Sequence, residues 1–132
     1  ENPKDFLNQA IIVETKFSPQ ELFTVLMKIE KALGRVRDGE KWSDRQIDID
    51  ILFYVNGDLK GGDGRGKIES IIIEDENLKI PHPRLHLRRF ALVPFNEIAP
   101  GFVHPGFNKT ISELLMECPD KSGVKKVLNA GK

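Results

Sequence analysis

Cysteine is nearly absent from this sequence of 132 residues, in which Cys118 is the only one. A single cysteine excludes an internal disulfide framework and a cysteine-rich zinc site, and it makes a reducing, cytoplasmic compartment the expected one. Charge of one sign is not in excess either, because 20 Lys and Arg residues balance 20 Asp and Glu residues. General nucleic-acid binders carry a basic excess, and membrane spans need roughly 20 consecutive apolar residues, which this chain lacks. We therefore expect neither a nucleic acid nor a membrane as a partner.

The composition that remains is typical of a folded domain. Hydrophobic residues make up 39% and charged residues 30% of the chain, which suits one core, and we expect a single domain over residues 1–132. A β-branched run at residues 9–17 predicts a strand. Ser18, Pro19 and Glu21 then form a helix start with a capping box, and Gly34 ends the apolar stripe that follows.

The second half of the chain predicts further strands and one helix. An alternating pattern predicts a strand at about residues 46–54, and Ile-rich or Leu/Val-rich runs predict short strands at 71–73 and 90–93. Residues 110–117 predict an amphipathic helix that opens with a capping box of Thr110 and Glu113. Strands interleaved with short helices indicate an α+β fold.

The strongest chemical feature is a pair of acids, Asp48 and Asp50, on the predicted strand 46–54. Residues two apart on a strand share a face and lie about 6–7 Å apart. Two carboxylates so close repel each other, and a divalent cation relieves that repulsion. Mg²⁺ prefers such hard oxygen ligands, commonly with substrate phosphates. The alternative is an edge strand with a solvated acidic face, and the spacing leaves both open.

Basic and aromatic side chains gather before and after this pair. Guanidinium groups bind polyphosphate oxygens through a planar fork of donors, and a flat aromatic ring can stack on a heterocycle. A histidine between two prolines has a stiff backbone and can bind phosphate or be structural. A solvated loop with its tryptophan in the core is the alternative for the earlier group. These residues are Arg35, Arg37, Lys41, Trp42 and Arg45 before the pair, and His82, Arg84, Arg88 and Arg89 after it.

Three segments in this order resemble the motifs of the 6-hydroxymethyl-7,8-dihydropterin pyrophosphokinases, a folate-pathway family. They are residues 33–37 (LGRVR), 42–52 (WSDRQIDIDIL) and 80–84 (IPHPR), the last followed by Arg88 and Phe90. The resemblance covers residues 6 to about 115. It implies a ferredoxin-like antiparallel sheet with helices packed on it. It also implies transfer of pyrophosphate from ATP to 6-hydroxymethyl-7,8-dihydropterin, giving the pterin diphosphate and AMP, with two Mg²⁺ ions bridging the phosphates.

The resemblance implies a role for each matching residue. Asp48 and Asp50 would hold the Mg²⁺ ions, and Arg35 and Arg45 would act with them in catalysis by contacting the transferring phosphates. The residues implied to bind the reduced pterin are Phe6, Asn8, Trp42 and Phe90. The residues implied to bind ATP are Glu30, Arg37, His82 and Arg88.

Some positions depart from the family's pattern. The family's first strand, with its Gly-Ser-Asn turn and helix, has no counterpart before Glu1. We therefore expect either that a companion chain or another segment completes the sheet, or that this sequence is a fragment of a longer protein. Trp-Gly-Pro-Arg is replaced by residues 42–45 (WSDR), which adds a negative charge near a phosphate site. Two other functions stay open: a non-catalytic nucleotide- or RNA-binding module, and a metal-dependent phosphoesterase that uses the same acids.

Overall fold

Helices and short antiparallel strands both occur in the computed structural model, which describes residues 7–34, 47–57 and 68–127. The α+β class is therefore confirmed. The chain divides into two compact units: Glu1–Val13 with Pro83–Lys132, called unit 1 here, and Glu14–His82, called unit 2. Among the described residues, every helix is too short or too polar to cross a membrane.

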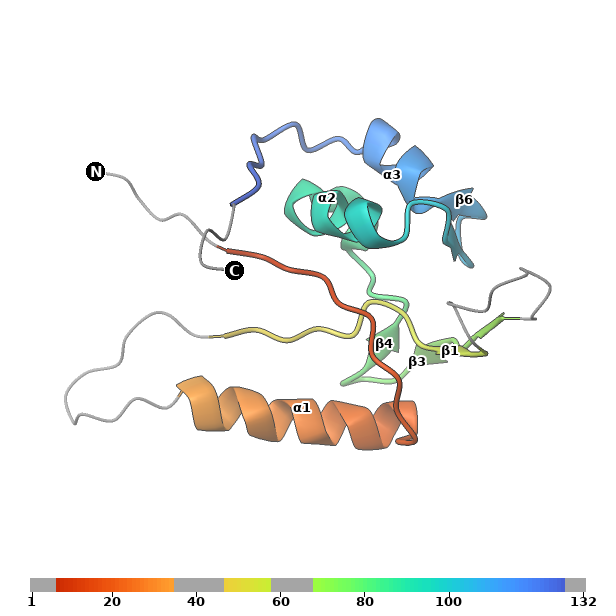
Figure 1. The fold of residues 1–132 in the computed structure, drawn as a ribbon. Coiled ribbons are helices and arrows are strands. Elements are labelled where there is room, and N and C mark those ends of the chain that lie inside the picture. The colour runs from red at the N-terminus through yellow and green to blue at the C-terminus, as the bar shows by residue number, and fades with distance from the viewer. Residues whose placement is uncertain (1–6, 35–46, 58–67, 128–132) are drawn as a thin grey trace. The chain divides into compact units, whose positions relative to one another are not determined.

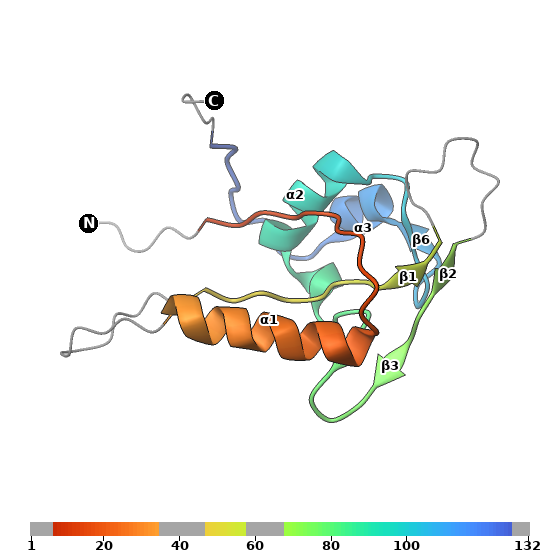
Figure 2. The same cartoon turned by 60° about the horizontal axis from the view of Figure 1, so that its bottom comes forward.

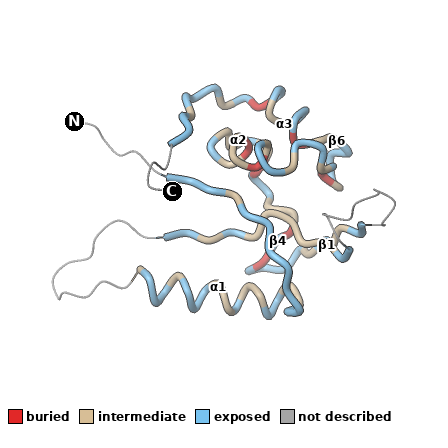
Figure 3. The backbone as a smooth tube through the Cα atoms, viewed as in Figure 1, coloured by how far each residue is buried: buried red, intermediate tan, exposed pale blue. Residues whose placement is uncertain are grey.

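Unit 2 begins with helix α1, Pro19–Gly34, whose bounds match the sequence prediction. The Ser18 hydroxyl accepts a hydrogen bond from the Glu21 N–H at 3.1 Å, and the Glu21 carboxylate accepts one from the Ser18 N–H at 2.9 Å. The predicted capping box is thus confirmed. No side chain of α1 is fully buried (Figure 3). Part of its predicted apolar stripe, including Ile29 and Leu33, remains open to solvent.

Two short hairpins complete the described part of unit 2. Their antiparallel pairs are β1 (Val55–Asn56) with β2 (Glu69–Ser70), and β3 (Ile73–Glu74) with β4 (Lys79–Ile80). Leu78 and Ile80 are the apolar side chains that are fully buried among the described residues of this unit. Ahead of β1, the extended segment 47–54 runs beside α1 in the opposite direction (Figures 1 and 2).

Unit 1 holds the more complete core. Its elements are the 3-10 helix η1 (Leu85–Leu87), α2 (Arg89–Ile98), β5 (Val103–His104), β6 (Lys109–Thr110) and α3 (Ile111–Glu117). Helices α2 and α3 pack on each other. The buried apolar side chains between the elements are Leu85, Leu92, Phe95, Ile111, Leu114 and Cys118. The predicted helix at 110–117 and its capping box of Thr110 and Glu113 are confirmed.

Three predicted strands are wrong as stated. Residues 9–17 and the described part of 46–54 run as extended chain, but neither forms a ladder with another described segment. A β-branched pattern favours extended backbone, whereas a ladder also needs a neighbour that supplies the opposite donors and acceptors. Residues 90–93 lie in α2, in which Leu92 and Phe95 are buried at helical spacing. The predicted short strand at 71–73 is confirmed only at Ile73, where β3 begins.

Candidate functional site

The extended segment 47–54 carries the predicted acids. Its Leu52 carbonyl accepts from the His82 N–H at 3.0 Å, and its Tyr54 carbonyl accepts from the Ile71 N–H at 2.9 Å. In an extended chain, backbone groups of alternate residues point to opposite edges. Residues 52 and 54 therefore face the hairpin side, and residues 49 and 51 present their N–H and C=O groups to the other edge.

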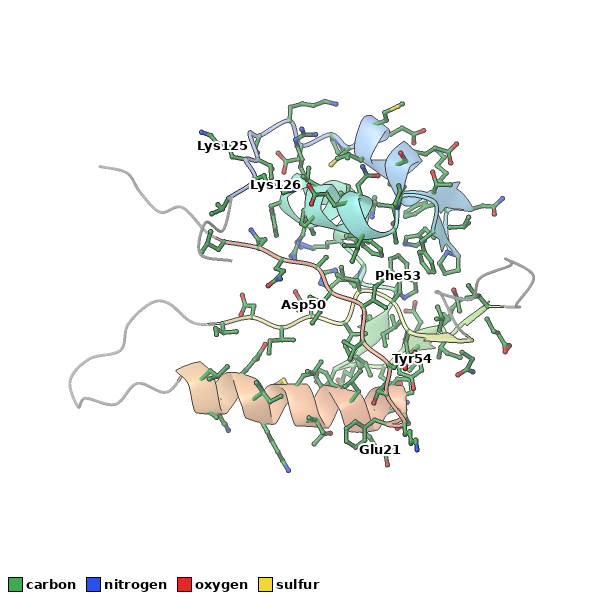
Figure 4. The ribbon with its side chains drawn as sticks, in the orientation of Figure 1. Glu21, Asp50, Phe53, Tyr54, Lys125 and Lys126 are labelled. Atoms are coloured by element: carbon green, nitrogen blue, oxygen red, sulfur yellow. The ribbon has the colours of Figure 1, made fainter. Side chains whose placement is uncertain are left out.

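Glu30 of α1 fixes the backbone between the two acids. Its carboxylate accepts a hydrogen bond from the Ile49 N–H at 2.6 Å, and both residues are half-buried. Ile49 stands between Asp48 and Asp50, so this one contact holds the segment at the position where the acids project. In Figure 4, Asp50 lies on the side of the segment away from α1. We call this arrangement of Glu30, Ile49, Asp48 and Asp50 the Glu30 clamp.

The two acids have the chemistry of cation ligands. Asp48 and Asp50 are exposed, and within the described ranges no hydrogen bond or ion pair engages either carboxylate. Free carboxylate oxygens are hard donors, which fit Mg²⁺ as two ligands of a shell that water and phosphate oxygens complete. A fully protein-built metal centre is not seen in residues 7–34, 47–57 and 68–127, because no group of three or more His, Cys, Asp or Glu side chains gathers there.

His82 lies in the same unit as the acids. Its side chain is half-buried between Pro81 and Pro83, and its N–H is bonded to the Leu52 carbonyl. That bond anchors the histidine backbone two residues along from Asp50. Unit 2 thus contains four residues that the sequence resemblance selected, and backbone or side-chain bonds tie two of them, Glu30 and His82, to the segment that carries the two acids.

Unit 1 holds a second group of selected residues at the start of α2. The Arg88 guanidinium carbon lies 5.6 Å from the centroid of the Phe90 ring, within the range of a cation–π contact. Phe90 is 41% exposed, so part of its side chain remains accessible to solvent. Asn8, also in unit 1, is exposed on the extended segment 7–13.

The other selected residues lie outside the described ranges. They are Phe6, Arg35, Arg37, Trp42 and Arg45.

Sequence reasoning missed one residue beside this second group, Asp120. Its carboxylate accepts from the Arg89 N–H at 3.3 Å in the first turn of α2. Contacts between residues 31 positions apart leave no periodic signal in a sequence. The pattern Asp120-Lys121-Ser122 is nevertheless typical of an acid that accepts from the backbone N–H two residues on, and this was the sequence signal that could have pointed to Asp120.

A buried histidine in unit 1 has a different environment. His104 Nδ1 accepts from the Gly106 N–H at 2.9 Å and from the Phe107 N–H at 3.3 Å, and its ring lies 4.7 Å from that of Phe107. Burial, with a smaller effect from His86, lowers the pKa of His104 below its ordinary value. This ring is held neutral as an acceptor for the turn between β5 and β6.

These features define a mixed helix-and-sheet protein with two exposed acids that have no partner in the part of the chain that the structure describes. Comparison with protein families narrows this class. The family model for 7,8-dihydro-6-hydroxymethylpterin-pyrophosphokinase (HPPK) matches residues 1–100. The chain belongs to this family, as the resemblance of its motifs predicts.

Individual relatives agree with the family match. The chain is 39% identical over 111 residues to the 2-amino-4-hydroxy-6-hydroxymethyldihydropteridine pyrophosphokinase of Synechocystis sp. These residues are 84% of this chain and 49% of that protein. The chain is also 39% identical over 122 residues to the protein of the same name from Methylorubrum extorquens. These residues are 92% of this chain and 66% of that protein. A folate synthesis bifunctional protein of Arabidopsis thaliana is 42% identical over 93 residues, which are 70% of this chain and 16% of that protein. The chain therefore spans about half to two thirds of the two bacterial relatives.

Proposed function

We propose that this chain takes part in transferring pyrophosphate from ATP to 6-hydroxymethyl-7,8-dihydropterin, which gives the pterin diphosphate and AMP in folate biosynthesis. Membership of the pyrophosphokinase family supports the reaction. The observation that carries the proposal is the Glu30 clamp, because it presents from one backbone position two carboxylates that have no partner among the described residues. The reaction would take place in the cytoplasm, within a single domain formed by residues 1–132.

The acid pair would hold two Mg²⁺ ions with the triphosphate. Bound Mg²⁺ neutralises phosphate charge and lowers the barrier to attack by an oxygen nucleophile. Asp48 and Asp50 would supply oxygen ligands to the ions, and Glu30 would keep the two ligands at a constant spacing through the Ile49 N–H. Preorganised ligands need no rearrangement when charge develops, which is the main contribution of a protein to phosphoryl transfer.

The residues of unit 1 would serve the two organic groups. The exposed Phe90 side chain would stack on a flat pterin, and the neighbouring Arg88 would offer charge for a nucleotide phosphate. Asn8 would donate and accept hydrogen bonds at the pterin edge. His82 and Glu30 of unit 2 would contribute to ATP binding. From outside the described ranges, Phe6 and Trp42 would contact the pterin, Arg37 would bind ATP, and Arg35 and Arg45 would bind the transferring phosphates.

We also propose that a further extended segment, from a companion chain or from the same protein, completes a ferredoxin-like sheet. Ile51 is half-buried, and its N–H and C=O have no hydrogen-bond partner among the described residues. Burying backbone groups without partners is unfavourable, so this edge favours addition of a strand at Ile51, beyond the Ile49 N–H that Glu30 already occupies. The bacterial relatives are longer than this chain, and their additional length supports such a segment.

The deciding experiment compares three single substitutions by titration calorimetry with Mg²⁺ and a non-hydrolysable ATP analogue. Asp48→Asn and Asp50→Asn remove one carboxylate charge each, while Asp75→Asn removes a charge from an exposed acid in the turn between β3 and β4. We expect each of the first two to weaken Mg²⁺-dependent binding at least about tenfold, which equals 1.4 kcal/mol. Asp75→Asn should bind like the original chain.

Product analysis separates the alternatives. AMP release that requires the pterin supports pyrophosphate transfer, whereas phosphate release without a pterin supports a phosphoesterase. RNA binding that needs no metal and weakens with salt supports a binding module. Absence of Mg²⁺-dependent nucleotide binding, also when any preceding segment of the same reading frame is included, would reject the proposed function.

A further inference from the structure

Helix α2 receives its N-terminal cap from a distant part of the chain. Its own N-cap residue, Arg88, makes no side-chain hydrogen bond to the first turn. The Asp120 carboxylate accepts from the Arg89 N–H instead, at 3.3 Å. First-turn N–H groups have no partner within a helix, so an outside acceptor stabilises the turn. A carboxylate is favoured at this end by the helix dipole as well.

The capping carboxylate is itself held in place. The Ser122 N–H donates to Asp120 Oδ1 at 2.9 Å, and the Ser122 hydroxyl donates to the same oxygen. The Arg89 Nε–H in turn donates to the Ser122 carbonyl at 3.0 Å. Residues 120–122 and the first turn of α2 therefore hold each other by bonds in both directions. These Ser122 bonds, with smaller effects from Arg89, lower the pKa of Asp120, so its carboxylate is charged near neutral pH.

The same terminal segment also contacts the far end of α2. Lys126 lies 3.6 Å from the Glu97 carboxylate, and both side chains are largely exposed. Figure 4 shows Lys125 and Lys126 on the segment that runs along this helix. An exposed ion pair contributes little, so the contact at residues 120–122 is the one that sets the start of the helix.

The first turn of α2 carries two residues of the proposed function on either side of Arg89. Arg88 precedes it and Phe90 follows it, and the Arg88 guanidinium lies against the Phe90 ring. We propose that Asp120 is a positioning residue for substrate binding: by capping the Arg89 N–H, it fixes the directions in which Arg88 and Phe90 project. This inference rests on the proposed function. A purely structural cap is the competing explanation, and it predicts a change in stability alone.

The test uses three substitutions in the full chain. Asp120→Ala removes the acceptor. Asp120 accepts from Arg89 through Oδ2 and from Ser122 through Oδ1, so Asp120→Asn keeps one of these two oxygen acceptors. Its remaining oxygen can still cap the Arg89 N–H, and the variant serves as the conservative rescue. Lys121→Ala is the matched control, because Lys121 is exposed next to Asp120 and makes no hydrogen bond or ion pair in the part of the chain that the structure describes.

Two measurements distinguish the explanations. Amide exchange measured by NMR reports the cap directly, and we expect the Arg89 N–H to exchange at least about tenfold faster in Asp120→Ala, with most protection regained in Asp120→Asn. Steady-state kinetics report positioning: KM for the pterin should rise about five- to tenfold in Asp120→Ala with a smaller change in kcat, and Asp120→Asn should restore KM. Lys121→Ala should change neither quantity.

Each result has one consequence. Faster Arg89 exchange with an unchanged KM would overturn the positioning role and leave a structural cap. Unchanged exchange in Asp120→Ala would overturn the cap itself. Failure of the original chain to bind nucleotide or pterin would reject the proposed function, whereas the exchange measurement would still decide whether Asp120 caps α2.

Discussion

Replacing Glu30 by Ala tests whether the acid pair is held by a single hydrogen bond. The change removes the acceptor that lies 2.6 Å from the Ile49 N–H. A hydrogen bond to a charged group contributes about 1.5–3 kcal/mol to the free energy of unfolding. Leaving a buried amide N–H without an acceptor lowers that free energy by about 1–3 kcal/mol. Both residues are half-buried, so water restores part of the loss and the lower end applies. Ala also favours a helix slightly more than Glu does, by a few tenths of a kcal/mol.

The free energy of unfolding should therefore fall by about 1–1.5 kcal/mol in Glu30→Ala. Glu30→Gln keeps an oxygen at the same reach and should lose less, about 0.5–1 kcal/mol, because the bond is no longer charge-assisted. Urea unfolding followed by far-UV circular dichroism measures both. Lys28→Ala is the control, since Lys28 is exposed on the same helix and has no hydrogen bond or ion pair among the described residues.

The order of the three unfolding midpoints decides whether the hydrogen bond from the Ile49 N–H to Glu30 stabilises the fold. We expect Lys28→Ala to stay near the original chain, Glu30→Gln to lie below it, and Glu30→Ala to lie lowest. A Glu30→Ala midpoint equal to that of Lys28→Ala would refute the clamp as a stabilising contact. In that case the acids would owe their position to the hairpin side of segment 47–54 alone.

Three other expectations concern unit 1. Leu92 is fully buried, so Leu92→Ala should lower the unfolding free energy by about 2–5 kcal/mol in denaturant titration. Thr110→Ala removes the capping box of α3 and should cost about 1 kcal/mol in the same assay, with Ser112→Ala, an exposed first-turn position, unchanged. Because His104 has a lowered pKa when folded, the unfolded chain binds its proton first, and stability should fall as pH drops below about 6.5. His104→Asn should flatten that decline, and an equal slope in both proteins would contradict the assignment.

Local sequence patterns predicted those elements that depend on local contacts. Both capping boxes, at Ser18 and at Thr110, formed as expected because each joins residues three apart. The alternation along segment 47–54 likewise predicted extended backbone there, and Asp48 and Asp50 are exposed on it, whereas the choice between a cation site and a solvated acidic face stays a prediction. These features depend only on residues that are close in sequence, so the sequence pattern alone predicts them.

Features that depend on distant partners could not be predicted in the same way. Residues 9–17 have the composition of a strand, but a ladder depends on a neighbour, and no described segment supplies one. Residues 90–93 favour strand by propensity, yet burial of Leu92 and Phe95 on one side makes them helical. Pro94 does not prevent this, although its ring removes one N–H from the helix. Tertiary packing outweighed local preference at that position.

The two carboxylate contacts found only in the structure use the same chemistry in different surroundings. Glu30 accepts the amide between two proposed metal ligands, and Asp120 accepts the amide between two proposed substrate-binding residues. Each acts on backbone, so neither side chain has to touch a ligand to affect binding. The Glu30 bond is shorter and half-buried, whereas Asp120 shares its charge with Ser122 near the surface. Loss of Glu30 should therefore appear first in stability. Loss of Asp120 should appear first in KM, because water can solvate the uncapped Arg89 N–H at little cost in stability, whereas a displaced Phe90 ring would weaken substrate binding.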